Sequence, residues 1–141
     1  MTEPRILIVD DDPAIRRMFE LVACCDGIVC DAACNGAEGV AAIRQNSYSA
    51  VFLDIMMPRV DGWGVLDFLR ARPQSRIRSL FMITATVDQN LSVGDRELVT
   101  GILYKPLHLD DVAALIRASA RGASAAGVLQ HTRHQLVMGY Q

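Results

Sequence analysis

The sequence predicts an α/β fold in which five strands form one doubly wound parallel sheet with five helices around it. Short apolar runs alternate along the chain with helical patterns, and the runs cover residues 6–9, 28–32, 51–53, 80–83 and 102–104. Each run is almost continuously apolar, which is typical of strands that are buried on both faces of a parallel sheet. The regular alternation of strand and helix favours right-handed crossover connections.

Size and composition restrict the class of protein. A chain of 141 residues with 51% hydrophobic residues is long enough for one domain with a buried core. Its net charge of −2 argues against a nucleic-acid surface spread over the domain, so we expect no direct nucleic-acid partner. No apolar stretch approaches the ~20 residues that a membrane helix needs, and residues 1–5 lack a signal-peptide pattern. The sequence predicts a cytoplasmic protein without a membrane partner.

The first helix has clear signals at both ends. Asp12 is placed to cap it, Pro13 suits its first position and Gly27 ends it. Apolar residues at helical spacing predict one buried stripe, formed by Ile15, Met18, Phe19 and Val22.

Two further helices follow from similar patterns. The second is expected to begin after Asn35 and to run to about Gln45. The third begins near Asp61 and Gly62 and stops before Pro73. The residues that the third helix should bury are Val65, Leu66, Phe68 and Leu69.

The last two helices differ in strength. The fifth is expected over residues 109–121, and the members of its buried face are Leu109, Val112 and Ile116. The fourth, over residues 88–99, contains Asn90, Ser92 and Gly94, which are poor helix formers. We therefore expect the fourth helix to be short or irregular.

The composition changes after Gly122, where a stretch rich in alanine, serine and glycine is typical of a linker. We therefore divide the chain into a domain over residues 1–121 and a C-terminal tail over residues 122–141. A short extra helix over residues 131–140 is one option for the tail.

The cysteines show no metal-binding spacing. Cys24, Cys25, Cys30 and Cys34 form no Cys-x-x-Cys pair, and the three histidines are distant in sequence. We expect reduced thiols, most of them buried, because a free cysteine packs as a small hydrophobic residue.

Acidic residues follow two of the apolar runs. Asp10 and Asp11 come after the first run and Asp54 after the third, and ligands gather at the carboxyl ends of the strands in an open parallel sheet. Two carboxylates ~4 Å apart repel by about 4 kcal/mol at an effective dielectric constant of ~20. A divalent cation relieves that repulsion, and oxygen ligands favour Mg²⁺, with Mn²⁺ as the alternative. Helix capping needs only Asp12, so it does not account for Asp10 and Asp11.

Asp54 is the candidate nucleophile, since a carboxylate can accept a phosphoryl group and form an acyl phosphate. The transferred group is negatively charged, so the protein has to position it and neutralise its charge. Lys105 follows the fifth run and supplies a compact positive charge. Thr84 closes the fourth run with a hydroxyl group that can donate a hydrogen bond. The sequence therefore predicts a site that handles a phosphoryl group beside a divalent cation.

The order of these residues resembles that of response regulator receiver domains in bacterial two-component signalling. The resemblance covers residues 4–121. Its motifs are Asp10-Asp11, the pattern Asp-x-x-x-Pro-x-x-Asp-Gly from Asp54 to Gly62, Thr84-Ala85 and Lys105-Pro106. The resemblance implies a flavodoxin-like sheet with the strand order 2-1-3-4-5.

The resemblance also implies roles for the acidic residues. Asp54 accepts the phosphoryl group from a sensor histidine kinase or a phosphotransfer protein. Asp11 and Asp54 bind Mg²⁺ directly, together with the backbone carbonyl of Met56, and Asp10 acts through water. The domain is then a phosphoacceptor in signalling rather than an enzyme, although it catalyses its own phosphotransfer and dephosphorylation.

The resemblance also implies that the signal is passed to a partner through the surface formed by the fourth helix, the fifth strand and the fifth helix. Lys105 contacts the phosphoryl group, and Thr84 moves toward it and changes this surface. Ile102 stands where the family commonly has an aromatic switch residue, and Tyr104, on the same face of the strand, is the alternative switch. The implied partner is a downstream protein or an output domain missing from this chain, with a homodimer through the same surface as an option.

The same residues suggest three other classes of protein. A flavodoxin-type cofactor binder would need a loop rich in Ser, Thr and Gly where this chain has three aspartates. A phosphatase with an aspartyl-phosphate intermediate usually carries Asp-x-Asp-x-Thr after the first strand, and that motif is absent. A pseudo-receiver that signals by protein contact without phosphorylation stays open as the alternative.

Overall fold

The computed structural model of the chain describes residues 3–57, 62–72, 77–85, 97–122 and 137–138. The strands are β1 (Arg5–Val9), β2 (Val29–Ala33), β3 (Tyr48–Asp54), β4 (Ile77–Thr84), β5 (Gly101–Tyr104) and β6 (Val137–Met138). The helices are α1 (Pro13–Cys25), α2 (Gly36–Gln45), α3 (Gly62–Arg70) and α5 (Leu109–Ala120). None of the helices within these ranges has the length and apolar character needed to span a bilayer.

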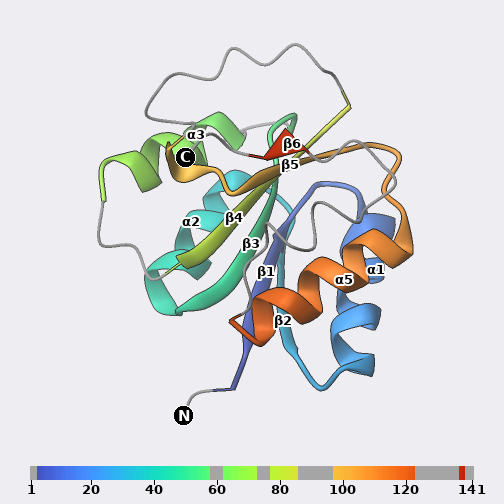
Figure 1. Ribbon diagram of the computed structural model, residues 1–141. Coiled ribbons are helices and arrows are strands. Elements are labelled where there is room, and N and C mark those ends of the chain that lie inside the picture. The colour runs from blue at the N-terminus through green and yellow to red at the C-terminus, as the bar shows by residue number, and fades with distance from the viewer. Residues whose placement is uncertain (1–2, 58–61, 73–76, 86–96, 123–136, 139–141) are drawn as a thin grey trace.

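The strands form one sheet with the order β2-β1-β3-β4-β5-β6 (Figure 1). The first five strands pair in parallel, which confirms the predicted fold class and the order 2-1-3-4-5. The sixth strand was not predicted. It pairs antiparallel with β5, with Val137 opposite Ile102 and Met138 opposite Gly101.

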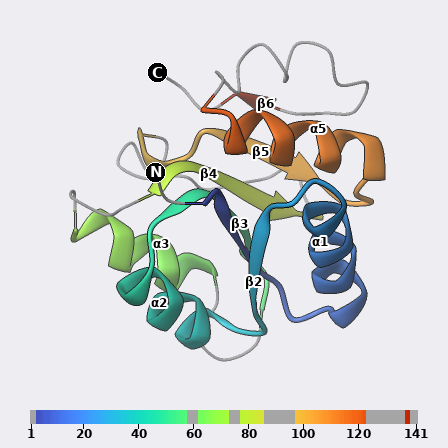
Figure 2. The same cartoon turned by 90° about the horizontal axis from the view of Figure 1, so that it is seen from below.

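Helices cover both faces of the sheet. In the view along the sheet, α2 and α3 lie on one side and α1 and α5 on the other (Figure 2). Each side has its own buried core, and Val65 and Leu66 of α3 belong to the first. On the second side Phe52 of β3 stacks on Phe81 at 5.1 Å between ring centroids and contacts Phe19 of α1 at 4.8 Å. Burial on both faces explains why the strands are continuously apolar in sequence.

The predicted helix ends are confirmed for α1 and α2. The side chain of Asp12 accepts a hydrogen bond from the Ala14 amide at 2.9 Å, and Asn35 accepts one from the Glu38 amide at 2.9 Å. Gly27 follows α1 with a φ of 67°, a conformation that side chains rarely adopt. The two N-caps therefore fix the residues at which α1 and α2 begin.

Of the residues predicted to be buried on the faces of α3 and α5, one is only partly buried and one is exposed. Phe68 packs against the core on the α3 side but is only half-buried, and the guanidinium groups of Arg44 and Arg72 lie 5.2 and 4.7 Å from its ring centroid. Leu109 is 56% exposed, because it is the first residue of α5 and the buried stripe begins one turn later at Val112.

The prediction that most cysteines are buried was also wrong. Cys24, Cys25 and Cys34 are exposed and Cys30 is half-buried. Cys24 and Cys25 occupy the last turn of α1, and Cys34 follows β2, so none of the three faces a core. Position in the helix and the turn outweighs the general tendency of cysteine to be buried.

Two predicted helices lie largely outside the described residues. For the fourth helix only the last part is described, where Glu97 and Leu98 are helical and Val99 is buried. For the option of a tail helix over residues 131–140, only Val137 and Met138 are described, and they form the strand β6 instead. The edge of β5 offers unpaired main-chain groups for hydrogen bonds with these two residues, whereas a short isolated helix is only marginally stable in water.

Candidate functional site

The predicted site residues meet at the carboxyl end of the sheet, the upper end in Figure 1. Asp10 follows β1, Asp54 ends β3 and Lys105 follows β5. One carboxylate oxygen from each of Asp10, Asp11 and Asp54 lies within 4.8 Å of the others. Asp10 and Asp54 are buried and Asp11 is exposed, so the group is open to solvent on the Asp11 side.

The turn after β1 holds Asp10 in place. Its Oδ1 accepts a hydrogen bond from the Asp12 amide at 2.8 Å, and its backbone carbonyl accepts one from the Arg16 guanidinium at 2.8 Å. Its Oδ2 is buried and accepts no hydrogen bond from the part of the chain that is described. Burial, with a contribution from the charge of Asp54, raises the pKa of Asp10 to about 6. The surroundings of Asp10 therefore compensate its negative charge only in part.

Asp54 is fixed by its own strand end and by α3. Its Oδ1 accepts a hydrogen bond from the Met56 amide at 2.9 Å, and its Oδ2 lies 3.1 Å from Lys105 Nζ. A Cβ atom on Gly62 would lie 2.6 Å from the Asp54 carbonyl oxygen and would also overlap Ile55. Only glycine lets α3 begin this close to the end of β3, which explains the glycine of the sequence motif.

Lys105 is the cation that both buried carboxylates share. Its Nζ lies 3.1 Å from Asp54 Oδ2 and 3.6 Å from Asp10 Oδ2. Burial lowers the pKa of Lys105, but the hydrogen bond to Asp54 and the two negative charges outweigh burial and raise it. Lys105 is therefore a stable positive charge at neutral pH. Its amide also donates to the Thr84 carbonyl at 2.8 Å, and the Lys105-Pro106 peptide bond is cis.

The predicted switch residues lie on β4 and β5. Thr84 ends β4, is buried and lies opposite Tyr104 in the strand pairing. Ile102 belongs to the core on the α3 side, and Tyr104 packs against the same core, so the two share a face as predicted. Tyr104 is half-buried. Thr84, Tyr104 and Lys105 thus form a continuous connection from the acidic group to the edge of the sheet.

Sequence patterns missed Arg16. Its guanidinium anchors the turn that carries Asp10, although Arg16 lies in the first turn of α1. A weak signal was available, because a basic residue near a helix N-terminus is disfavoured by the helix dipole and needs another reason to be there.

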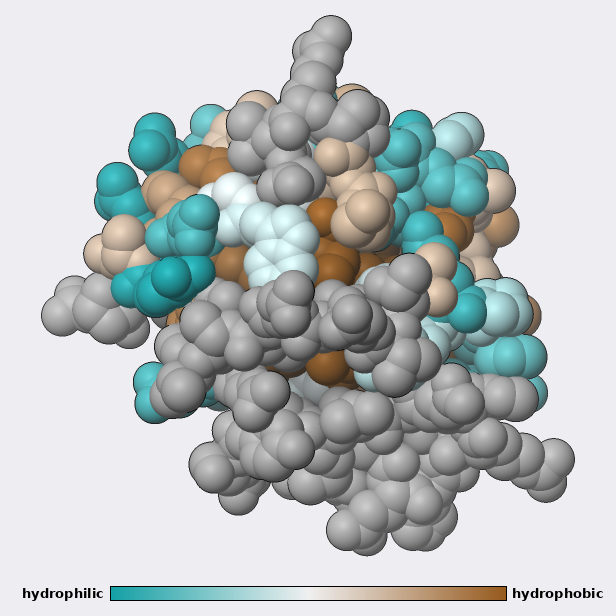
Figure 3. Space-filling view, turned by 90° about the horizontal axis from the view of Figure 1, so that it is seen from above, coloured by the Kyte–Doolittle hydropathy of each residue, from teal (hydrophilic) through white to brown (hydrophobic). Residues whose placement is uncertain are grey.

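The donor set fits a divalent cation. All side chains in the acidic group offer carboxylate oxygens, and the unpartnered Oδ2 of Asp10 can accept a hydrogen bond from a metal-bound water. Two buried carboxylates share one ammonium group, so the described site has surplus negative charge. Seen from above, the described surface at this end is hydrophobic near its centre and hydrophilic at its rim (Figure 3). Met56, beside the site, is 67% exposed.

The fold and the acidic site together define the class of protein. Residues 6–117 match the family model for the response regulator receiver domain. The chain therefore belongs to the response regulator receiver domain family. Domains of this family are signalling domains of two-component systems rather than enzymes of the usual kind, they are typically phosphorylated on an aspartate, and they typically bind Mg²⁺ and interact with a histidine kinase.

Comparisons with individual proteins agree with this assignment. The chain is 34% identical over 121 residues to a probable transcriptional regulator, ycf27, of Pyropia yezoensis, covering 84% of this chain and 48% of the relative. It is 33% identical to the DNA-binding dual master transcriptional regulator RpaA of Synechocystis, covering 84% and 49%. A receiver domain protein of Methanospirillum hungatei has a similar fold, with a TM-score of 0.73, 25% identity and coverage of 86% and 96%. The chain spans about half the length of the curated relatives it matches.

Proposed function

We propose that Asp54 accepts a phosphoryl group from the phosphohistidine of a histidine kinase or a phosphotransfer protein. An oxygen of Asp54 forms the bond to phosphorus, the bond between phosphorus and the histidine nitrogen breaks, and the imidazole keeps the electron pair and takes up a proton. The observation that carries the proposal is a buried carboxylate, at the end of a central strand, held 3.1 Å from an ammonium group. The ammonium group of such a pair can neutralise negative charge on the transferred group.

The carboxylates would hold the metal ion. Asp11 and Asp54 would bind Mg²⁺ directly with the backbone carbonyl of Met56, and Asp10 would act through water, with Mn²⁺ as an alternative ion. When bound, the cation supplies positive charge to the phosphoryl oxygens. The spacing of the three carboxylates within 4.8 Å and the unpartnered oxygen of Asp10 support this assignment.

Lys105 and Thr84 would act after the transfer. Phosphorylation removes the charge of the Asp54 carboxylate, so Lys105 would move from that carboxylate to the phosphoryl oxygens. The hydroxyl of Thr84 would donate a hydrogen bond to another phosphoryl oxygen. Attack of water on phosphorus would later restore the Asp54 carboxylate and release phosphate, which makes the signal reversible. The strand pairing of Thr84 with Tyr104 supports a connection to the surface.

The output would pass through protein contacts. We propose that a downstream protein, an output domain or a second copy binds at the face of the fourth helix, β5 and α5, with Tyr104 rather than Ile102 as the side chain that responds. The net charge of −2 supports a protein rather than a nucleic acid as the direct partner of this domain. DNA binding is part of the description of RpaA, and this chain spans about half of that protein.

Phosphorylation of the isolated chain tests the proposal. Incubation with phosphoramidate and Mg²⁺ should add one phosphoryl group, measured by intact-protein mass spectrometry, and chelation of Mg²⁺ should abolish the addition. Asp54→Asn should not be labelled. Asp31→Asn is a matched control, because Asp31 is a half-buried carboxylate away from the site. Equal labelling of Asp54→Asn and the parent would show that another residue is the phosphoacceptor.

The pseudo-receiver alternative makes the opposite prediction. A domain that signals by contact alone would bind its partner equally well with and without phosphoramidate. Labelling of Asp54 without any effect on partner binding would therefore favour the alternative over phosphorylation-dependent signalling.

A further inference from the structure

Asp11 differs from the other two carboxylates of the acidic group in how it is held. Asp10 and Asp54 are buried, and each accepts a hydrogen bond from a backbone amide. Asp11 is exposed, and its side chain forms no hydrogen bond or ion pair with the part of the chain that the structure describes. The position of the Asp11 carboxylate is therefore set by the backbone on either side of it.

The two peptide groups that flank Asp11 are each tied to a side chain. Before Asp11, the carbonyl of Asp10 accepts a hydrogen bond from Arg16 Nη1 at 2.8 Å. After Asp11, the amide of Asp12 donates a hydrogen bond to Asp10 Oδ1 at 2.8 Å. Because each peptide group is planar, these two bonds restrict the backbone dihedral angles of Asp11 and so the direction in which its side chain leaves the turn.

The position of Arg16 suits a role on the main chain. Arg16 lies in the first turn of α1 and is half-buried. A cation there is disfavoured by the helix dipole, so a compensating contact is expected. The guanidinium forms no ion pair with a carboxylate in the described ranges, and its hydrogen bond goes to the carbonyl of Asp10 instead. Arg16 therefore acts on the backbone of the turn and not on a carboxylate.

We propose that Arg16 is a positioning residue for the metal site and that it orients Asp11 through the carbonyl of Asp10. The inference rests on the proposed function, in which Asp11 binds Mg²⁺ directly. Arg16 contacts neither the ion nor the phosphoryl group. It restricts the turn before the ion arrives, so less freedom is lost when Asp11 becomes a ligand. Substitution of a residue that orients a metal ligand typically weakens metal binding by roughly 10–100-fold.

Charge and position predict opposite effects of removing the Arg16 side chain. A positive charge near an acidic site repels a divalent cation, so loss of the charge alone should strengthen Mg²⁺ binding. Loss of the hydrogen bond frees the peptide group before Asp11, so the ligand has to be ordered when the ion binds, and Mg²⁺ binding should weaken. The sign of the change in affinity therefore separates a positioning role from an electrostatic one.

Arg16→Met in the full-length, unphosphorylated chain tests the proposal, with Arg17→Met as the matched control. Arg17 is the next residue of α1 and carries the same charge, but it is exposed and has no hydrogen bond or ion pair to the described residues. The dissociation constant for Mg²⁺ is measured by titration of the fluorescence of Trp63, the one tryptophan of the chain, which lies at the start of α3 beside the end of β3. We expect Arg16→Met to weaken binding by roughly 10-fold, and Arg17→Met to leave it unchanged or slightly stronger.

A conservative variant and a rate measurement complete the test. Arg16→Lys should restore much of the affinity, because an ammonium group can donate to the same carbonyl. In Arg16→Met, the Mg²⁺ concentration that gives the half-maximal rate of labelling by phosphoramidate should rise, whereas the rate at saturating Mg²⁺ should stay close to that of the parent. Urea denaturation without Mg²⁺ checks that the variants are folded. If Arg16→Met is unfolded, Arg16→Lys and Arg17→Lys form the pair, and weaker binding is expected in the first alone.

Three results would overturn the inference and leave the proposed function intact. They are equal Mg²⁺ affinity of the Arg16 and Arg17 variants, tighter binding in Arg16→Met, and a lower rate at saturating Mg²⁺ with unchanged affinity. Tighter binding would mean that Arg16 acts through its charge, and a lower saturating rate would mean that it acts on the transfer itself. A parent that binds Mg²⁺ but is not labelled at Asp54 would contradict the proposed function and not the role of Arg16. A parent that does not bind Mg²⁺ would overturn both.

Discussion

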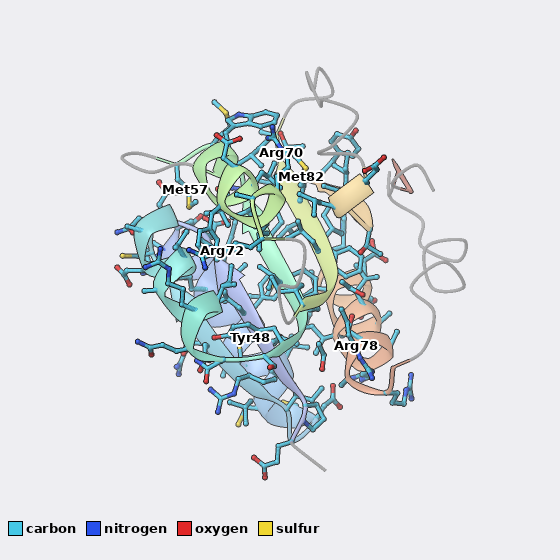
Figure 4. All side chains as sticks on the ribbon, turned by 90° about the vertical axis from the view of Figure 1, so that its left-hand side faces the viewer. Tyr48, Met57, Arg70, Arg72, Arg78 and Met82 are labelled. Carbon is cyan, nitrogen blue, oxygen red and sulfur yellow. The ribbon has the colours of Figure 1, made fainter. Side chains whose placement is uncertain are left out.

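The two ends of β3 each carry an acidic network, and they differ in how the negative charge is balanced. Tyr48 begins β3, and Asp54 ends it. Tyr48 and Met57, which follows the strand, lie at opposite ends of the sheet (Figure 4). The comparison separates a structural network from a site that is built for a ligand.

At the Tyr48 end, one carboxylate has two donors. Asp31 Oδ2 accepts a hydrogen bond from Arg5 Nη1 at 2.8 Å and another from the Tyr48 hydroxyl at 2.7 Å. Burial, together with the hydrogen bond to Asp31, raises the pKa of Tyr48, so its hydroxyl stays a donor. The negative charge is matched by one guanidinium, and the network is electrically balanced.

At the Asp54 end, two buried carboxylates share one ammonium, and Asp11 adds a third negative group at the surface. Asp10 Oδ2 has no hydrogen bond from the described residues, and the pKa of Asp10 is raised to about 6. This end is therefore strained electrostatically in the absence of an added cation. A buried carboxylate alone does not identify the functional end of the sheet. An excess of buried negative charge over positive charge does.

Lys105→Met should produce the largest effect on stability. Removing the shared ammonium leaves Asp10 and Asp54 buried together, which should lower the free energy of unfolding by about 3 kcal/mol at pH 8 without Mg²⁺. Urea denaturation measures the loss, and Mg²⁺ should recover much of it.

Arg70→Met is the control for Lys105→Met. Arg70 forms an ion pair with Asp67 at 2.7 Å, but both side chains are exposed, so the cost should be about 0.5 kcal/mol. Equal losses in the two variants would show that Lys105 is not compensating a buried charge.

Asp10→Asn should have the next largest effect, in the opposite direction. The raised pKa of Asp10 means that ionisation destabilises the fold as pH rises from about 4 to about 6. The destabilisation is complete above the folded-state pKa and absent below the unfolded-state value. Asparagine keeps the acceptor for the Asp12 amide, so it should raise the free energy of unfolding at pH 8 without Mg²⁺ by about 1–3 kcal/mol.

Thermal melts of Asp10→Asn and the parent at pH 4 and pH 8 check this expectation. The gain should disappear at pH 4, where Asp10 is protonated in both states. Mg²⁺ should stabilise the parent more than the variant. A gain of the same size at both pH values would mean that something other than charge explains it.

The sequence predicted the residues at the Asp54 end and the repulsion between its carboxylates, but not the distances that decide how each charge is compensated. Asp10, Asp54 and Lys105 could be identified because each follows an apolar run, and strand ends of a parallel sheet meet at one edge. That Lys105 lies closer to Asp54 than to Asp10, and that Asp10 keeps an unpartnered oxygen, depends on ångström-scale packing. No local pattern encodes such distances.

The hydrogen-bonded network at the Tyr48 end could not be predicted from the sequence at all. Arg5, Asp31 and Tyr48 come from three different strands and belong to no motif. Their meeting depends on the register that places Arg5 beside Val29 and Ile6 beside Ala50. The strand β6 escaped prediction for a related reason, since two residues carry no periodicity and their pairing depends on an open edge far away in sequence.

Tyr48→Phe should have a smaller effect than either substitution at the site. It removes one donor to Asp31 and leaves the Arg5 ion pair, so the free energy of unfolding should fall by about 1 kcal/mol. The stabilisation by Mg²⁺ and the labelling of Asp54 should stay as in the parent, because Tyr48 lies at the other end of β3. A weaker response to Mg²⁺ in Tyr48→Phe would mean that the two ends are coupled through the strand.

Arg5→Met should have the smallest effect, and its salt dependence should complete the comparison. The side chains of Arg5 and Asp31 are 37% and 31% exposed, so solvent screens their ion pair. We expect a loss of at most about 1 kcal/mol at low ionic strength, and the loss should shrink in high salt as the Debye length falls to about 3 Å at 1 M. The loss in Lys105→Met should persist in high salt, because Asp10 and Asp54 are buried and poorly screened. If both losses shrink equally with salt, the charges at the Asp54 end are as well solvated as those at the Tyr48 end, and surplus buried charge no longer distinguishes the two.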